Sequence, residues 1–255
     1  MVGYSLKSEE EIELMIEGGR RLSKIRNLLI SRTRPGIKTI ELDRLAEREI
    51  LEAGGTPSFK TVKGYKNTIC VSVNEEVVHG IPGERVIKEG DVVGIDVGLI
   101  YKGFHTDTAW TILVQSAKRK AQKEIEKFLK VGEETLKKVI EMARPGNRIG
   151  KISQAIQENI EGAGYSVVRV LTGHGVGRQL HEEPPIPQFF DGKIEETPEI
   201  LPGMTLAIEI IYNLGMPEVI LKKDGWTIVT ADGKISGIFE KSIAVQKNGI
   251  LVLTP

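Results

Sequence analysis

The sequence predicts an α+β fold made of two similar halves, each with two helices followed by antiparallel strands. Amphipathic helical segments and β-rich segments alternate twice along the 255 residues. Two turn signals also repeat at one offset. The segment Arg34-Pro35-Gly36 recurs 110 residues later as Arg144-Pro145-Gly146, and Ala53-Gly54 recurs as Ala163-Gly164. Such a repeat indicates that a helix-helix-strand unit occurs twice.

The composition is that of an ordinary globular protein. Hydrophobic residues make up 40% and charged residues 27% of the chain. Because Lys+Arg and Asp+Glu both number 35, nothing predicts binding to nucleic acid or to an anionic membrane. No segment has the length of a membrane span, the N-terminus lacks the apolar core of a signal peptide, and the single Cys70 excludes an internal disulfide. We therefore expect a cytoplasmic protein.

In the first half, two helices are expected ahead of the strands. Ser8 and Glu11 form a capping-box pattern, which begins a helix that ends near Ser31. Thr39 is expected to cap a second helix, ending at Gly54-Gly55. The segments expected next are strands at 58–62 and 68–74, and irregular chain at 74–90.

The second half is expected to repeat this order. A Lys/Glu-rich helix is expected over 116–143, with its charges on a solvated face, and a second helix over 149–163. A Pro-rich loop is expected over 181–202. The expected strands are 167–171, 204–212, 218–222, 226–230, 237–246 and 250–253.

A β-hairpin expected over residues 92–114 contains two acids, Asp96 and Asp107. If its turn centres on Tyr101-Lys102, the two carboxylates are cross-strand neighbours, with Cβ atoms about 5 Å apart. Like charges at that spacing repel, so they require a cation or a shared proton unless the face is solvated. The apolar residues around both acids favour the cation.

Two further acids lie in apolar strands of the second half. The six-residue spacing from a glycine to Asp96 recurs between a glycine and Glu209, and the counterpart of Asp107 is then Glu240. A lone ionised Glu in an apolar run is costly unless it is paired or bound to a cation. Four carboxylates in one cavity carry a charge of about −4, which two divalent cations would neutralise.

The four histidines differ in how well they fit such a centre. His174, between two glycines, is the best candidate for the nitrogen ligand that is typical of transition metals. Its Gly-rich segment does not fit the Rossmann or P-loop patterns. His79 and His181 are each either surface-loop residues or site residues that hydrogen-bond a reacting carbonyl in acyl-bond hydrolysis. A structural hydrogen bond is the expectation for His105.

Together these segments resemble the type I methionine aminopeptidases, and the resemblance runs from the first helix to the last strand. The motifs that carry it are Asn74-Glu75 with His79-Gly80-Ile81-Pro82, Ile95-Asp96-Val97-Gly98, Gly103 to Thr108, Gly173 to Arg178 with His181-Glu182-Glu183-Pro184, Ile208-Glu209 and Phe239-Glu240. Five metal-ligand motifs in the order and spacing of one family are a specific signal.

The resemblance implies the pita-bread fold, in which pseudo-twofold halves share a curved antiparallel sheet covered by helices. It implies one catalytic metallopeptidase domain over residues 1–255, with halves of about 1–115 and 116–255. It also implies two divalent metal ions, whether cobalt, manganese, iron or zinc. The ligands that it implies are Asp96, Asp107, His174, Glu209 and Glu240.

The activity implied is removal of the N-terminal methionine from nascent proteins whose second residue is small, by attack of a metal-bridging hydroxide on the scissile carbonyl. Glu209 would be the acid/base partner, His79 would face the substrate's N-terminal side, and His181 the scissile carbonyl. The methionine pocket would be lined by Tyr65, Cys70, His79 and Trp226. The resemblance further implies a cytoplasmic monomer that acts near the ribosome and requires neither nucleic acid nor a membrane.

The sequence departs from the family pattern at a few positions near these motifs. Lys241-Ser242 stand where His-Thr is usual, Ile210 where Pro is common, and Leu180 and Val62 where pocket aromatics are common. The alternatives are an Xaa-Pro aminopeptidase or prolidase, and a non-catalytic binding protein that keeps the fold. The former normally have an additional N-terminal domain, and the latter lose metal ligands that this chain retains.

Overall fold

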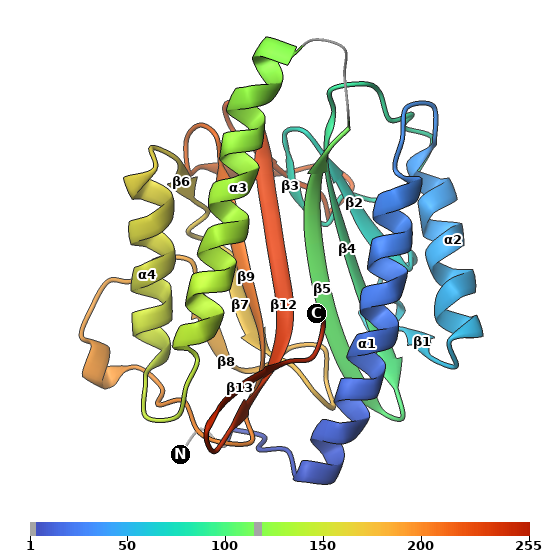
Figure 1. Ribbon diagram of the computed structural model, residues 1–255. Helices are drawn as coiled ribbons and strands as arrows, with labels where there is room; N and C mark the ends of the chain where they lie inside the picture. Colours follow the sequence, from blue (N-terminus) through green and yellow to red (C-terminus); the bar gives the residue numbers. More distant parts are fainter. Residues whose placement is uncertain (1–3, 115–118) are drawn as a thin grey trace.

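A computed structural model describes residues 4–114 and 119–255 of the chain, and its centre is a large antiparallel sheet (Figure 1). The main path of this sheet runs through β1 (Thr56–Pro57), β4 (Val92–Tyr101), β5 (Phe104–Leu113), β12 (Ser236–Gln246), β9 (Thr205–Asn213), β7 (Thr172–Gly175) and β8 (Glu182–Pro187). Three strands extend it by pairing with β4, β9 and β12: β2 (Ile69–Val73), β6 (Ser166–Val167) and β13 (Gly249–Val252). A separate small sheet consists of β10 (Val219–Leu221), β11 (Ile228–Thr230) and β3 (Glu76–Val78).

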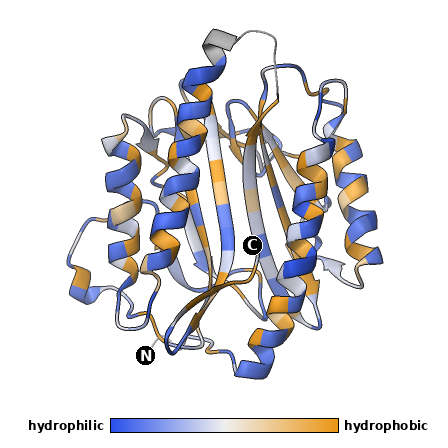
Figure 2. Cartoon of the chain, in the orientation of Figure 1, coloured by the Kyte–Doolittle hydropathy of each residue, from blue (hydrophilic) through white to orange (hydrophobic). Residues whose placement is uncertain are grey.

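Four helices cover one face of the large sheet, as Figure 1 shows. They are α1 (Glu9–Arg32), α2 (Thr39–Glu52), α3 (Arg119–Met142) and α4 (Ile149–Gly162); η1 (Phe59–Thr61) and η2 (Ile194–Glu196) are short 3-10 turns. The helices turn an apolar stripe toward the sheet and a polar stripe away from it (Figure 2). One apolar core joins α1 and α2 to β2 and β4, and another joins α3 and α4 to β9 and β12.

The two halves are related about the β5–β12 pair. Each half places a helix pair over its own strands. In the order β4-β5-β12-β9, the inner strands β5 and β12 correspond to each other, and so do the outer strands β4 and β9. The repeated turns also share one backbone conformation. Gly36 and Gly146 have φ of 94° and 82°, and Gly54 and Gly164 have 72° and 87°. Glycine adopts these left-handed conformations without steric cost, which explains why the turn signals recur.

Most elements lie where the sequence predicts them, and the capping box of Ser8 and Glu11 begins α1. Thr39, however, is not the N-cap of α2. That position is Lys38, and Thr39 is the first helical residue. The hydroxyl of Thr39 instead accepts a hydrogen bond from the N–H of Gly83 at 2.8 Å. The threonine therefore ties the helix start to the loop after β3.

Three segments differ from the strands and loops expected. Residues 58–62 are not a strand: they contain the turn η1, in which the N–H of Thr61 donates to the carbonyl of Ser58 at 3.0 Å. The segment 74–90 contains β3, and the loop 181–202 contains β8. The first residues of the helix expected over 116–143 lie outside the described part of the chain.

The Gly-rich segment is itself a strand, β7, whereas the strand expected at 167–171 is only the short β6. A Cβ atom on Gly173 would lie 2.8 Å from the carbonyl oxygen of Ala207, and one on Gly175 would lie 2.4 Å from that of Glu183. Glycine is required here because neighbouring backbones approach closely. Among the described residues, no helix combines the length and the apolar character needed to cross a membrane.

Candidate metal centre and substrate cavity

A cavity of about 850 Å³ is lined by residues of the large sheet, by Val78 of the small sheet and by the loops beside them. The structure brings every site residue expected from the sequence to this one cavity. Its lining includes Asp96, Asp107, His174, Glu209, Glu240, His79, His181, Tyr65, Cys70, Trp226, Val62 and Leu180. Ile210 and Lys241 are not in the lining: Ile210 packs in the helix-side core, and Lys241 lies over the ring of Trp110.

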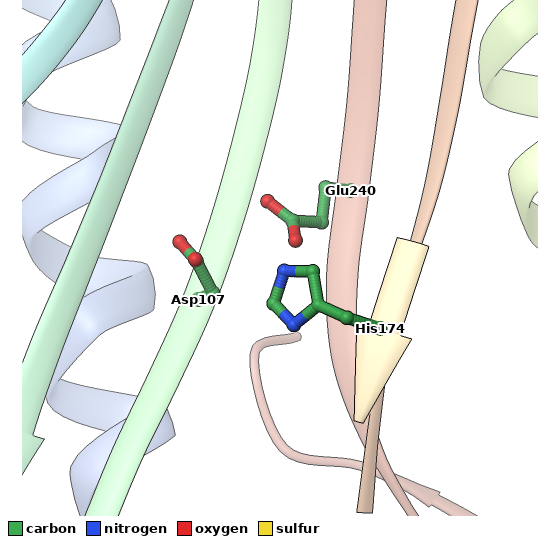
Figure 3. Close-up of side chains that lie close together, drawn as sticks. All are labelled: Asp107, His174 and Glu240. Atoms are coloured by element: carbon green, nitrogen blue, oxygen red, sulfur yellow. The ribbon is translucent and has the colours of Figure 1, made fainter. Parts of the chain in front are cut away.

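Three potential metal ligands from three strands converge in the cavity. Asp107 extends from β5, Glu240 from β12 and His174 from β7 (Figure 3). One ligand atom from each lies within 4.8 Å of the others. That spacing is small enough for a single cation to contact all three. Asp96 and Glu209 lie outside this compact group but line the same cavity.

The hairpin register differs by two residues from the one expected. Asp107 faces Gly98, and Asp96 faces Ala109. The turn is Lys102-Gly103, with φ of 52° and 85°, as in a type I′ turn, which favours glycine at its second position. The two acids are thus diagonal rather than direct neighbours. A shift of two residues keeps both side chains on the same face.

Glu209 and Glu240 face each other directly across the β9–β12 ladder. Both are buried, at 8% and 3% exposure, and the buried Oδ1 of Asp96 has no hydrogen-bond partner among the described residues. Burial raises the pKa of Asp107 to about 7 and, with the charge of Asp107, that of Glu209 to about 8. It also raises the pKa values of Asp96 and Glu240 well above their usual range. Such a set of buried carboxylates must either hold protons or bind cations, because burial and mutual repulsion disfavour several unpaired charges in one cavity.

His174 is prepared to act as a nitrogen ligand. Burial, and then the proximity of His181, lower the pKa of His174 to about 4, so its ring is neutral at pH 7. Its Nδ1 lies 2.9 Å from the carbonyl oxygen of Gly175, a contact that requires the proton on Nδ1. The lone pair of Nε2 is then free for a metal. Carboxylates combined with one imidazole fit divalent transition metals.

The metal-free protein should lose thermal stability as the pH rises from about 6.5 to 8. Unfolded Asp and Glu have pKa values of about 4, so the folded state retains protons that the unfolded state releases until the pH passes the raised pKa values of Asp107 and Glu209. Burial lowers the pKa values of the histidines. Their protonation therefore lowers the stability of the folded protein only below about pH 6.5, outside this range. Thermal denaturation of chelator-treated protein tests this. Adding a divalent metal should remove the decline, and a rise in stability over this range without metal would contradict the argument.

An aromatic pocket adjoins the acidic centre. The rings of Tyr65 and Trp226 pack edge-on with centroids 5.1 Å apart, and Phe59 packs on Tyr65 at 6.5 Å. The hydroxyl of Tyr65 lies 2.8 Å from the carbonyl oxygen of Ile69 and 3.2 Å from the Sγ of Cys70. Phe59 was not among the site residues expected. The sequence predicted a strand at 58–62, and that prediction did not indicate that the Phe59 side chain joins the pocket, although Phe59 lies three residues before Val62.

His79 and His181 both line the cavity and come from segments about 100 residues apart in the sequence. His79 has a left-handed backbone, with φ of 57°, and the next residue must be glycine because a Cβ on Gly80 would lie 2.3 Å from the carbonyl of Val71. The ring of His181 packs edge-on against that of His174, with centroids 4.5 Å apart. Burial lowers the pKa of both histidines, so both are neutral hydrogen-bonding groups at pH 7.

Two polar residues outside the cavity lining, His105 and Gln188, make buried hydrogen bonds beside the acids of β5 and β9. Nδ1 of His105 lies 2.6 Å from the hydroxyl of Ser58, the structural hydrogen bond expected for it. The buried Gln188 donates to the carbonyl of Glu209 at 3.1 Å and accepts from the N–H of Ile211 at 3.0 Å. It thus satisfies the carbonyl of Glu209 itself and the N–H two residues further along β9. The sequence placed Gln188 in the Pro-rich loop expected over 181–202 but contained no signal for its contacts with β9.

Comparison with known proteins agrees with this arrangement. The sequence pattern of metallopeptidase family M24 matches residues 13–247. The chain belongs to metallopeptidase family M24. Membership makes it a metal-dependent hydrolase with a pita-bread fold, and the carboxylates and His174 provide the donor set that such a metal requires.

Within M24, the chain is similar to methionine aminopeptidases over its full length. It is 45% identical to that of Clostridium perfringens over 98% of both chains, and 45% identical to methionine aminopeptidase 1 of Bacillus subtilis over 97% of this chain and 98% of that protein. The crystal structure of the Thermotoga maritima enzyme superposes with a TM-score of 0.93 at 39% identity, covering 99% of both chains. A prolidase from Pyrococcus furiosus, at 23% identity and a TM-score of 0.78, shares the fold, but only 65% of that chain is covered.

Proposed function

We propose that this M24 enzyme removes the N-terminal methionine from polypeptides whose second residue is small. The observation that carries the proposal is the junction, in one cavity, of a buried carboxylate–histidine centre and an aromatic pocket. The apolar, polarisable thioether of methionine packs well against aromatic rings. Two relatives that are 45% identical over almost the full length are named for this activity, whereas the prolidase likeness is one of fold.

The metal centre of the proposal comprises five ligands. Four are the carboxylates of Asp96, Asp107, Glu209 and Glu240, and the fifth is His174. Their combined charge balances two divalent cations, with cobalt, manganese, iron and zinc all compatible with the donor set. When bound, such cations supply a nucleophilic water at neutral pH and polarise the scissile carbonyl.

The remaining roles belong to side chains of the protein. A carboxylate oxygen of Glu209 takes the proton of the attacking water and returns it to the leaving amine. The neutral His181 donates a hydrogen bond to the carbonyl oxygen, whose negative charge grows as the tetrahedral intermediate forms. His79 contacts the substrate's N-terminal side. Both rings donate from a site where burial keeps them uncharged.

Substrate selection follows from the shape of the pocket. Tyr65, Cys70 and Trp226 surround the methionine side chain, and Phe59 extends the aromatic wall beyond Tyr65. Val62 and Leu180 line the same cavity where aromatics are common in the family. Smaller side chains at these two positions leave a wider pocket, which tolerates methionine analogues with larger substituents on sulfur.

The wider context forms part of the proposal. We infer one catalytic domain, with halves of about 1–115 and 116–255, that acts as a cytoplasmic monomer on nascent chains near the ribosome. Balanced charge supports this interpretation, since Lys+Arg and Asp+Glu both number 35 and neither nucleic acid nor a membrane is needed for the reaction.

The purified protein should release methionine from Met-Ala-Ser and Met-Gly-Met-Met peptides only when a divalent metal is present. The measurement is free methionine after chelation and after re-addition of cobalt, manganese, iron or zinc in turn. An Xaa-Pro dipeptide serves as the control substrate. Metal-loaded protein that cleaves the Xaa-Pro peptide but not the methionyl peptides would overturn the assignment in favour of a prolidase-like enzyme.

A further inference from the structure

A buried ion pair lies next to His181 in the chain, because one of its members is the following residue, Glu182. Lys7 and Glu182 form it with side chains that are only 2% and 9% exposed. In each of the other ion pairs among the described residues, at least one side chain is 36% or more exposed. A charge pair removed from water in this way costs desolvation, so its place beside the cavity calls for a functional explanation.

Two glycines allow Lys7 to reach this position. A Cβ atom on Gly177 would lie 2.2 Å from Cε and 2.6 Å from Nζ of Lys7, so the lysine stem crosses the space that a side chain there would fill. The chain before α1 also passes over Gly203, whose carbonyl accepts a hydrogen bond from the N–H of Lys7 at 2.8 Å. Nζ donates a further bond to the carbonyl of Ser5 at 2.9 Å. Lys7 is therefore held at both its backbone and its ammonium group.

Glu182 connects this lysine to the turn between β7 and β8. Its Oε2 pairs with Lys7, while its Oε1 accepts a hydrogen bond from the N–H of Gln179 at 3.0 Å. The N–H of Gly177 donates to the carbonyl of Gln179 at 3.0 Å, and the carbonyl of Gly177 accepts from the N–H of His105 on β5. The turn 177–182 is thus fastened to β5 on one side and to Lys7 on the other.

His181 lies inside this turn, directly before Glu182, and its ring enters the cavity beside His174. We propose that Lys7 is a positioning residue: by holding the carboxylate of Glu182, it fixes the turn 177–182 and so the hydrogen-bonding direction of the His181 ring. The proposal rests on the proposed role of His181 at the scissile carbonyl. Because a displacement of about 1 Å can lower a rate by about 100-fold, a small shift of this turn affects kcat.

The test asks whether a substitution at Lys7 lowers kcat only when His181 is present. Lys7→Met retains an apolar stem of similar length across Gly177 and removes the ammonium group, with its charge and its hydrogen bonds to Glu182 and Ser5. We expect it to lower kcat for a Met-Ala-Ser peptide by about 10- to 100-fold, with KM and the affinity for Mn²⁺ nearly unchanged. In a His181→Ala background the same substitution should change kcat by no more than about twofold, because the group being positioned is absent.

Glu182→Gln provides the second variant, because it keeps the shape and the acceptor for Gln179. It should lower kcat as Lys7→Met does, and the double variant should be no worse than either single one. Lys38→Met is the matched control: its ion pair with Glu84 is 45% and 78% exposed, and its kcat should equal that of the unaltered protein. Circular dichroism and thermal denaturation verify the fold of each variant.

The outcomes separate this inference from the proposed function. If the unaltered protein cleaves methionyl peptides but Lys7→Met leaves kcat unchanged, or lowers it by the same factor with and without His181, the positioning role is wrong and the function stands. If Lys7→Met only lowers the melting temperature and kcat remains normal in the folded fraction, Lys7 is structural. If the unaltered protein does not cleave these peptides, it is the proposed function that fails.

Discussion

Replacing Asp107 by asparagine should abolish methionine release while the protein remains folded. Asp107 is buried in the cavity lining, and its carboxylate faces the side chains of Glu240 and His174 (Figure 3). Asparagine has the same shape and can still accept the 2.9 Å hydrogen bond that the Thr108 N–H donates to the Asp107 side chain. It lacks the negative charge that a shared metal ligand contributes. We expect kcat to fall by at least about 10³-fold, with metal affinity also reduced.

The same substitution should stabilise the metal-free protein at pH 8, which separates a lost ligand from a damaged fold. Burial raises the pKa of Asp107 to about 7, so ionising it in the folded, metal-free state costs up to about 4 kcal/mol at about 1.4 kcal/mol per pKa unit. Asparagine avoids that cost. Thermal denaturation after chelation should therefore show a higher melting temperature for Asp107→Asn than for the unaltered protein.

A carboxylate-to-amide change outside the cavity provides the control. Asp91 accepts hydrogen bonds from Asn74 Nδ2 and the Lys88 N–H at 2.9 and 2.8 Å and contributes nothing to the cavity lining. Asp91→Asn should keep kcat within about twofold. Turnover by metal-saturated Asp107→Asn comparable to that of the unaltered protein would remove Asp107 from the ligand set.

The sequence predicted the acidic face of the sheet even though its register was wrong. Asp96 and Asp107 were expected to face each other, but the Lys102-Gly103 turn moves the pairing by two residues. Side chains alternate with a period of two, so this error leaves both acids on the cavity face. An error of one residue would have placed one of them among the apolar residues under the helices. The glycine at the second turn position was the available signal for the correct register.

Local sequence patterns did not predict the contacts between segments that are far apart in the chain. The cavity wall opposite the ligand strands depends on β11 pairing with β3, which joins residues near 228 to residues near 78. That pairing places Trp226 beside Tyr65. Lys7 likewise appears in the sequence as an ordinary surface lysine, because no local pattern shows that Gly177 leaves room for its stem. The motifs predicted the candidate ligands, whereas the contacts of Lys7 are visible only in the tertiary structure.

Replacing His181 by alanine should lower kcat by about 10²- to 10³-fold, the usual loss when one donor to a developing oxyanion is removed. The ring is neutral because burial lowers its pKa, so the N–H that it offers persists throughout the working pH range. His79→Ala should act in the same direction, since His79 lines the same cavity and burial also lowers its pKa. Steady-state kinetics with Met-Ala-Ser measures both effects.

Metal affinity distinguishes this role from that of a ligand. His181 packs edge-on against His174 at 4.5 Å, close enough that its loss could be mistaken for loss of a ligand. Calorimetric titration with Mn²⁺ should give unchanged stoichiometry for His181→Ala and a reduced one for His174→Ala. His181→Gln, which restores a side-chain N–H donor, should recover part of kcat. If titration instead shows that His181→Ala has lost a metal ion, His181 joins the ligand set and the donor to the carbonyl must be sought at His79.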